Sequence, residues 1–278
     1  MKVMHNFLVG FSLLALCFTE IVRAESNINS QLKMYIFDCG TVEVSDMDIF
    51  SSSGDYANIK KTLTSSCFLV RHERGDLLWD TGLTASIVNV EPAVNGVFTL
   101  SMSKTLPEQL EEIGMKPEDI EFISISHSHF DHIGQISAFK SSAWLVHQRE
   151  SAAMFSTEKS RNTYSDFIGM KRKIFNGDFD VFGDGSVIIR DMPGHTEGHT
   201  VLQLMLPKTG PVLLSGDLYH QAKSRKLKRV PRLNVDEMQT RKSMARFERI
   251  ASKLGAKVII QHEKAQIDNL PKSPNFLE

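Results

Sequence analysis

The chain has 278 residues, of which 41% are hydrophobic and 23% are charged, and its formal net charge is −1. This is the composition of an ordinary globular protein, and the length is enough for one large domain. Because the net charge is close to zero, the balance of charges gives no reason to expect a nucleic acid or an acidic membrane surface as partner.

Residues 1–24 have the pattern of a cleavable secretory signal. Lys2 and His5 precede a run of twelve mostly apolar positions, FLVGFSLLALCF, and the segment ends on Ala24. Such a run is too short to span a bilayer comfortably, so we expect no permanent membrane anchor. We predict cleavage after Ala24, a mature domain of residues 25–278, and a periplasmic or secreted location.

The first half of the mature chain is rich in predicted strands. Val, Ile, Phe and Leu are enriched at 32–44, 65–72, 76–82, 119–126 and 142–150. The polar residues of 45–61 predict a loop, and 84–103, with a proline and a glycine, is predicted to be irregular. Residues 105–115 predict a short helix with Pro107 in its first turn and Gly114 at its end.

The second half repeats the strand pattern and adds a long helix. Strands are predicted at 186–194, 200–207, 210–217 and 257–262. The apolar residues of 236–256 recur at helical spacing, so we expect Met238 and Met244 to face the core. Strand-rich halves with a helix or two each predict an α+β fold, in which two sheets pack face to face with helices outside.

Removal of the signal segment would leave two cysteines, Cys39 and Cys67, each in a strand-like run. An even pair in an oxidising compartment is consistent with a disulfide. Two buried free thiols are the alternative. Neither cysteine has the spacing of a metal site.

Three histidines and an aspartate stand within six positions of the segment HSHFDH. If the segment continues as a strand, His127 and His129 point to the same side and can converge on one ion. A turn after them would let Asp131 and His132 face a second ion. Imidazole and carboxylate are ligands suited to zinc and to other divalent metals.

Two ions need more than four side chains, and three further candidates each follow an apolar strand. These are His195, Asp217 and His262. Taken singly, each is also typical of an ordinary loop or turn. Ligands at strand ends are what a rigid, preorganised site requires, and three of them after the first cluster favour a functional site.

With these motifs in the same order, the sequence resembles the metallo-β-lactamase-fold superfamily of hydrolases. The shared motifs are WDTG (79–82), HSHFDH (127–132), PGHTEGH (193–199), SGD (215–217) and His262. The resemblance implies a four-layer αβ/βα sandwich with two zinc ions, although other divalent metals are possible.

The resemblance also assigns the individual residues. His127, His129 and His195 would bind the first ion, and Asp131, His132 and His262 the second. Asp217 would bridge both ions. Asp80 would orient a ligand rather than bind metal, and His199 would stabilise its loop.

Two metals can hold a bridging hydroxide, with the pKa of water brought near neutrality, that attacks a carbonyl carbon or a phosphorus. Asp131, a ligand beside this nucleophile, would accept and pass on the proton. A non-catalytic or redox member of the fold is the other class of function. The complete ligand set, without room for a fused flavin domain, favours hydrolysis.

The segments LLWDTGL and TGPVLLSGDLYH most resemble the N-acyl-homoserine-lactone lactonases. The resemblance implies a small-molecule lactone substrate and a quorum-quenching activity. Another ester, a thioester (as in glyoxalase II) or a β-lactam is the alternative. Lactonases usually carry a substrate-contacting tyrosine three residues after the bridging aspartate. Here His220 has that position and Tyr219 precedes it, so either could contact the lactone, or both could be packing residues.

Six cations lie between Lys223 and Arg232 without an acid among them. A solvated loop is the simpler interpretation. A basic rim near the metals, favouring an anionic substrate, is the alternative, and it does not support a neutral lactone. The poorly patterned segments 84–103 and 153–178 are expected to shape the substrate pocket.

Overall fold

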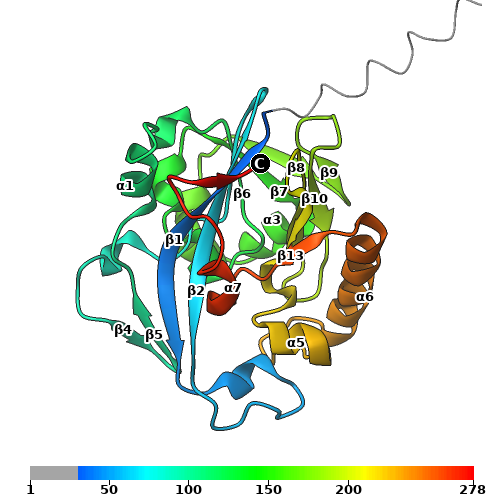
Figure 1. Cartoon of the computed structure of the whole chain (residues 1–278). Coiled ribbons are helices and arrows are strands. Elements are labelled where there is room, and N and C mark those ends of the chain that lie inside the picture. The colour runs from blue at the N-terminus through cyan, green and yellow to red at the C-terminus, as the bar shows by residue number, and fades with distance from the viewer. Residues whose placement is uncertain (1–30) are drawn as a thin grey trace, which may run out of the picture.

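The structure of the protein is a computed structural model that describes residues 31–278, so the predicted signal segment lies outside the described residues. Two β-sheets pack together and helices lie on their outer sides (Figure 1). Across the first sheet the strands run in the order β4 (Ala93–Asn95), β5 (Phe98–Ser101), β1 (Lys33–Val44), β2 (Lys61–His72), β3 (Gly75–Trp79), β6 (Phe122–Ser124), β7 (Ala143–His147) and β8 (Arg172–Phe175), and β14 (Phe276–Leu277) also pairs with β1.

The second sheet is assembled from the later part of the chain. Its order is β13 (Lys257–Ile259), β12 (Gly210–Leu214), β11 (Thr200–Leu206), β10 (Val187–Asp191) and β9 (Phe179–Asp180). Neighbouring strands from β9 to β12 are antiparallel, whereas β13 runs parallel to β12. Because of this parallel pairing, the carboxyl ends of β12 and β13 lie at the same edge of the sheet.

The helices are mostly short. They are α1 (Leu106–Glu111), α2 (Phe130–Ile133), α3 (Gln148–Met154), α4 (Glu158–Thr163), α5 (Ala222–Leu227), α6 (Glu237–Leu254) and α7 (Lys264–Ile267). Figure 1 shows α1 and α6 on opposite sides of the pair of sheets. The predicted α+β class with two sheets and outer helices is therefore confirmed.

The central strands are buried on both faces, which explains their near-continuous apolar runs. In β1, Met34 and Ile36 belong to the core between the two sheets, whereas Tyr35 and Phe37 belong to the core on the outer face. A third apolar cluster lies on the outer side of the second sheet and includes Phe247 of α6. Alternate residues of one strand thus serve two different layers.

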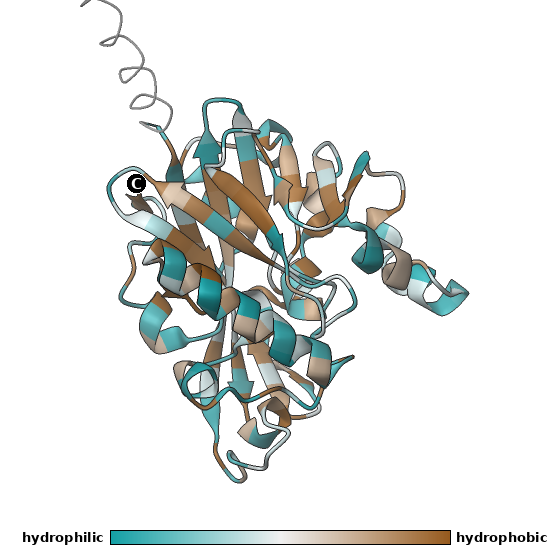
Figure 2. Cartoon of the chain, turned by 90° about the vertical axis from the view of Figure 1, so that its right-hand side faces the viewer, coloured by the Kyte–Doolittle hydropathy of each residue, from teal (hydrophilic) through white to brown (hydrophobic). Residues whose placement is uncertain are grey.

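Helix α6 begins after Asp236, whose side chain accepts a hydrogen bond from the backbone N–H of Gln239, and ends at Gly255 with a φ of 61°. Figure 2 shows hydrophilic residues along its outward side. Met244 is buried as predicted, but the prediction for Met238 was wrong, because this side chain is 68% exposed. Met238 lies in the first turn of the helix, beyond the edge of the apolar face.

The predicted strands are found, most of them with shorter bounds, and three predictions need correction. The strand expected at 142–150 ends at His147, where α3 begins. The nominally irregular segment 84–103 contains the strand pair β4 and β5. Segment 153–178 contributes α4 and β8; several of its apolar side chains, such as Phe167 and Phe175, pack into the cores, and none of its residues lines the pocket at the histidine cluster.

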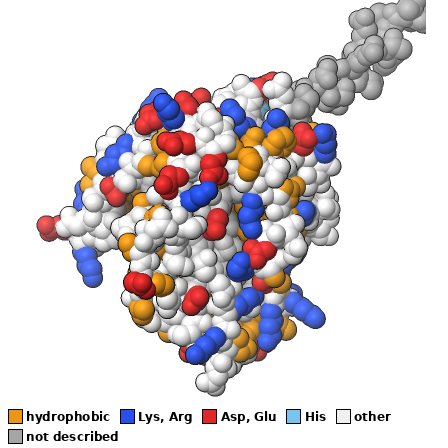
Figure 3. Space-filling model, turned by 60° about the vertical axis from the view of Figure 1, so that its left-hand side comes forward, with side chains coloured by type: hydrophobic (Ala, Val, Ile, Leu, Met, Phe, Trp, Pro, Cys, Tyr) orange, Lys and Arg blue, Asp and Glu red, His pale blue; other side chains and the backbone are white. Residues whose placement is uncertain are grey.

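Acidic and basic side chains are interspersed over the face shown in Figure 3, consistent with the near-zero net charge. Within residues 31–278, none of the helices has both the length and the apolar content that crossing a bilayer requires.

Candidate metal centre

The structure brings all seven predicted ligands together, and each lies in the loop or short helix that follows a strand. The HSHFDH segment follows β6, His195 follows β10, and His262 follows β13. Asp217 follows β12, in the short 3-10 helix η6 (Gly216–Leu218). The candidate ligand atoms form two groups, each with its atoms within 4.8 Å of one another: His127, His129, His195 and Asp217, and Asp131, His132 and His262.

The local geometry of HSHFDH differs from the predicted continuation of the strand. Strand β6 ends at Ser124, and His127 and His129 lie in the loop after it. His129 is the N-cap residue of α2, which carries Asp131 and His132. A loop followed by one helical turn, rather than an alternating strand, therefore directs the two pairs of side chains to two neighbouring positions.

Asp217 lies between the two groups. Its Oδ2 atom is 3.2 Å from His195 Nε2 and 3.5 Å from His127 Nε2. Its Oδ1 atom is 3.0 Å from His262 Nε2 and 3.4 Å from His132 Nε2. One carboxylate oxygen thus faces each group, which is the arrangement of a bridging ligand.

The buried polar atoms of this cluster fit divalent metal ions. His127 Nε2 and Asp217 Oδ1 are buried and have no hydrogen-bond partner among the described residues. Leaving such groups without a partner is costly, so a ligand is expected there. The Nε2 atoms of His132 and His262 lie 3.2 Å apart, which is close to the separation of two nitrogen ligands on one tetrahedral zinc ion.

The other ring nitrogens are bound by the protein, which fixes the orientation of each ring. His132 Nδ1 lies 2.9 Å from Asp80 Oδ2, and His262 Nδ1 lies 2.8 Å from the Thr64 carbonyl oxygen. Metal-binding histidines typically donate their second N–H to such acceptors, which leaves Nε2 free to bind the ion. His195 has the same arrangement with the side-chain oxygen of an asparagine, Asn234.

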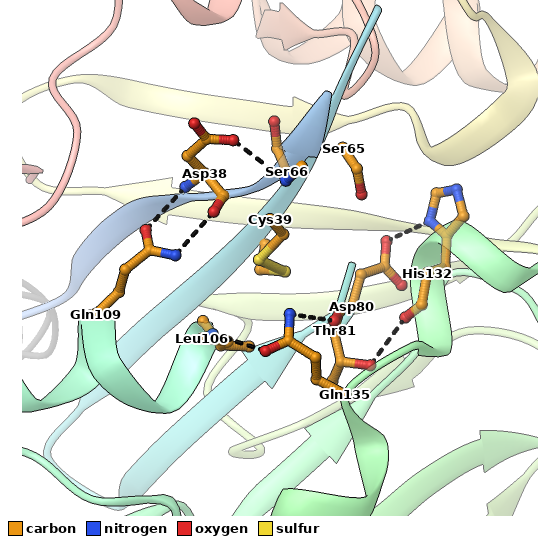
Figure 4. Close-up of a disulfide and its surroundings, with 12 residues drawn as sticks. Asp38, Cys39, Ser65, Ser66, Asp80, Thr81, Leu106, Gln109, His132 and Gln135 are labelled. Atoms are coloured by element: carbon orange, nitrogen blue, oxygen red, sulfur yellow. Dashed lines mark hydrogen bonds and ion pairs between the residues drawn. A yellow bond between two sulfur atoms is a disulfide. The ribbon is translucent and has the colours of Figure 1, made fainter. Parts of the chain in front are cut away.

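Asp80 occupies the position predicted for a supporting aspartate. Besides His132, its carboxylate accepts hydrogen bonds from the backbone N–H and hydroxyl of Ser126 and from Gln261 Nε2. Its backbone has a left-handed φ of 60°. Figure 4 shows Asp80 directed at the His132 ring, with Thr81 bound to the His132 backbone.

Cys39 and Cys67 form a disulfide between β1 and β2, so the first of the two predicted interpretations is confirmed. Figure 4 shows it beside the turn that carries Asp80 and Thr81. Gly82 ends this turn with a φ of 64°, and a side chain there would collide with Cys39. The disulfide therefore packs directly against the loop that orients His132.

Glu150 is a supporting residue that the sequence analysis missed. It is buried at the start of α3, and its carboxylate accepts hydrogen bonds from the backbone N–H groups of Ser128 and Gly198 and from the Thr196 hydroxyl. It thereby ties the HSHFDH loop to the loop of His195. An acid just after an apolar strand is the available signal, but the run 142–150 predicts a continuous strand, whereas the strand ends at His147 and α3 begins at Gln148.

His199 stabilises its loop, as predicted. Its Nδ1 donates to the Met192 carbonyl oxygen at 2.9 Å, and its Nε2 accepts from the backbone N–H of Asp217 at 2.9 Å. Burial lowers the pKa of His199 to about 3, so the ring is neutral and can accept this hydrogen bond. Through this hydrogen bond His199 holds the backbone of Asp217 in place.

The electrostatics of the cluster separate the histidines into two kinds. Burial lowers the pKa of His127 well below its usual value and that of His129 to about 4. Burial also opposes the charged forms of His132 and His262, but the nearby Asp217 carboxylate raises the pKa of both. The pKa of Asp217 is well below its usual value despite burial, because histidines surround it. Asp217 is thus held ionised, and the positive charge that stabilises it comes from the neighbouring imidazoles when no ion is bound.

The structure separates the two residues predicted to contact the substrate. Tyr219 is buried beneath α6, and its hydroxyl donates to Glu248 Oε1 at 3.0 Å. It does not reach the cluster, so the predicted direct role of Tyr219 is corrected to packing. The side chain of the next residue, His220, points instead toward the cluster, and its Nε2 lies 3.0 Å from Asp217 Oδ2.

A cavity of about 220 Å³ opens onto the cluster. His129, Asp131, His195, Asp217, His220 and His262 form its polar side. Its apolar side consists of Val42, Phe50, Leu63, Phe98, Phe130 and Leu233. Phe98 comes from segment 84–103, and its place in the lining supports the prediction that this segment shapes the pocket. A larger hollow of about 870 Å³ is lined by Tyr219 and by residues of α6, and none of the candidate metal ligands lines it.

The basic segment Lys223–Arg232 is only partly the predicted solvated loop, because Lys223, Lys226 and Lys228 are exposed but the three arginines have protein partners, and none of its cations lines the pocket at the cluster. Its first half is α5, and Arg225 pairs with Glu248 at 2.8 Å. Arg229 binds Asp55 and Arg232 binds Asp48. Three of its cations are therefore used to hold neighbouring parts of the fold together.

The fold and the ligand cluster together define a metal-dependent hydrolase. The model of the metallo-beta-lactamase superfamily matches residues 61–262. The chain belongs to this superfamily.

Its relatives are more specific. The chain is 31% identical, over 80% of its length and 94% of the relative's, to an N-acyl homoserine lactonase of a Bacillus species. It is 24% identical, over 90% of its length and all of the relative's, to the N-acyl homoserine lactonase AttM of Azorhizobium caulinodans.

Solved structures agree with these relatives. An N-acyl homoserine lactone hydrolase with the product N-hexanoyl-L-homoserine bound at its catalytic metal centre matches with a TM-score of 0.76 and 26% identity, over 88% of this chain and 98% of that one. The predicted similarity to the lactonases within the superfamily is therefore confirmed.

Proposed function

We propose that this protein is a dinuclear zinc lactonase that opens the lactone ring of N-acyl homoserine lactones, an activity of the quorum-quenching type. The observation that carries the proposal is the single buried carboxylate, Asp217, with one oxygen facing each of two ligand groups at the end of a pocket. In this proposal His127, His129 and His195 hold one ion, and Asp131, His132 and His262 hold the other.

The shape and chemistry of the pocket support an acylated lactone. The polar side can receive the ring and its carbonyl, and the apolar side, which includes Phe50, Phe98 and Leu233, can cover an acyl chain. Phe130 is 41% exposed at this pocket and Leu233 is 47% exposed, so apolar surface continues to the outside. A neutral, partly apolar substrate needs no basic rim, consistent with the paired arginines of the basic segment.

When both ions are bound, they would supply Lewis acidity toward the lactone carbonyl and lower the pKa of water. In the proposed reaction Asp131 accepts the proton and later donates it. Its side chain is 14% exposed, compared with 4% for Asp217, and its Oδ2 lies 3.6 Å from His262 Nε2. It can accept a proton from the attacking water, and after the ring C–O bond breaks it can deliver this proton to the leaving oxygen.

The proposal is tested with the purified metal-loaded protein on a panel of substrates. The panel contains short- and long-acyl homoserine lactones, S-lactoylglutathione, a carbapenem and a phosphodiester, each followed by product mass. We expect the lactones to be hydrolysed fastest. Much faster hydrolysis of the thioester or the β-lactam would overturn the substrate assignment and leave the metal centre standing.

The matched variants are Asp131→Asn and Tyr219→Phe. The first removes the proton acceptor with little change of shape, and kcat should fall by about a hundredfold or more. Tyr219→Phe alters a neighbouring buried residue that does not reach the cluster and should retain activity. Metal analysis of both variants shows whether a loss of activity comes from a loss of metal.

We also propose export to the periplasm or beyond, with cleavage after Ala24. The charged and apolar pattern of the first 24 residues supports export, and so does the Cys39–Cys67 disulfide, because disulfides persist in oxidising compartments. The test is the mass of the protein recovered from a bacterial host that expresses the full chain. A protein beginning at Glu25, outside the cytoplasm and without free thiols, is expected, whereas an uncleaved cytoplasmic chain would overturn the proposal.

A further inference from the structure

His220 joins the cluster although it is not among the seven predicted ligands. Its Nε2 atom lies 3.0 Å from Asp217 Oδ2, and the side chain is almost completely buried. The candidate ligand atoms of His220, Asp217 and His262 all lie within 4.8 Å of one another. His262 is therefore shared between this group and the group that contains Asp131 and His132.

Packing fixes the direction of the His220 ring. The ring lies 4.2 Å from the Phe50 ring, and it stacks on the His262 ring at 5.4 Å with an angle of 9° between the planes. Phe50 is itself held in place, because the Ile49 carbonyl oxygen accepts a hydrogen bond from the backbone N–H of Arg232 at 2.9 Å. An imidazole clamped in this way keeps its Nε2 edge toward Asp217.

We propose that His220 is an eighth metal ligand. Because its ring stacks on His262 and its ligand atom groups with that of His262, we assign it, through Nε2, to the ion of Asp131, His132 and His262. A buried imidazole nitrogen among carboxylate and imidazole donors is the environment in which zinc binds. With Asp217 shared, this ion would have five protein ligands and the other ion four. The inference rests on the proposed metal centre and is independent of which substrate the enzyme hydrolyses.

The competing explanation is that His220 only donates a hydrogen bond to Asp217. Two variants separate the explanations. His220→Gln can keep an N–H donor near the position of Nε2 but offers a much poorer ligand. His220→Phe keeps a flat ring against Phe50 and His262 but removes both nitrogens.

The test measures metal binding directly on the full mature protein loaded with Co²⁺ or Zn²⁺. A competing chromophoric chelator gives the affinity of each site, and the visible ligand-field bands of Co²⁺ report its coordination. In both variants we expect one of the two sites, that of Asp131, His132 and His262, to lose affinity on the order of tenfold or more, and its Co²⁺ bands to change. The affinity of the other site should change much less, and Tyr219→Phe should match the unaltered protein in both readouts.

The proposal is overturned if His220→Gln binds two ions with unchanged affinity and unchanged Co²⁺ bands. Loss of metal in the Phe variant alone would likewise assign His220 to hydrogen bonding. Thermal unfolding of each metal-free variant checks that the fold is intact. Because lactone hydrolysis is not the readout, failure of the proposed substrate leaves this test unaffected.

Discussion

Two parts of this molecule collect charged or ionisable side chains, and the structure uses them in opposite ways. In the cluster around Asp217, buried nitrogen and oxygen atoms of different loops face one another, and some have no hydrogen-bond partner among the described residues. In the basic segment Lys223–Arg232, Arg225, Arg229 and Arg232 each bind a carboxylate of the protein.

The comparison of the cluster with the basic segment shows which polar groups are available to bind an ion or a substrate. Charges that already have protein partners hold parts of the fold together. At the surface, such pairs add little to the free energy of unfolding. Buried groups that lack partners are costly unless an ion or a substrate completes them. At the cluster, buried atoms without a partner coincide with converging imidazole and carboxylate groups, and this combination, rather than the density of charge in the sequence, marks the candidate functional site.

The largest effect is expected for Asp217→Ala. Because Asp217 faces both ligand groups, its removal should release at least one metal ion and lower kcat/KM by more than about a hundredfold. Metal analysis together with lactone hydrolysis measures the change. Near-normal turnover with two ions still bound would rule out the bridging role.

A smaller loss is expected for Asp80→Asn, which perturbs a residue that orients a ligand without binding metal. The amide cannot accept hydrogen bonds from His132, Ser126 and Gln261 as the carboxylate does. Metal affinity should fall about 10- to 100-fold. Equilibrium competition with a chelator measures it, and an unchanged affinity would show that the ring of His132 is held by its other contacts.

Asp178 lies in a charge cluster whose members have protein partners, so its loss should affect stability and not metal binding. Burial opposes ionisation, but hydrogen bonds from Arg190 and Arg246 hold the pKa of Asp178 below its usual range. Its stabilising effect is therefore complete above the pKa of the unfolded chain, near 4, and is lost as the pH falls through the lower folded-state value.

Asp178→Asn should lower the free energy of unfolding by about 1–2 kcal/mol at neutral pH. The difference should shrink as the pH is lowered below about 4. Urea unfolding at several pH values measures this. A difference that does not depend on pH would mean that the carboxylate charge is not responsible.

The smallest effect is expected for Arg225→Gln in the basic segment. Arg225 and Glu248 are both partly exposed, and such pairs contribute at most about 1 kcal/mol. Metal content and lactone hydrolysis should be unchanged. A selective loss of activity on anionic substrates would instead place this segment at the rim of the active site.

Much of the fold and of the candidate site follows from local patterns. Runs such as that of β1 predict strands buried on both faces, and the caps of α6 mark its ends. The ligands could be found because metal chemistry restricts the residue types and because strand-end loops present them. The start of α3 was missed, because an apolar strand continues into it without a break and Glu150 has its partners in distant loops.

Residue type and short-range order in the sequence predicted the class of fold and the seven candidate ligand positions, and the resemblance to the superfamily added the supporting role of Asp80. Only the tertiary structure decided that Tyr219 turns beneath α6 while His220 turns to Asp217. It also decided that the arginines of the basic segment are paired and that Cys39 meets Cys67. These outcomes depend on which distant elements pack beside each side chain, and that information is not contained in the neighbouring residues of the chain.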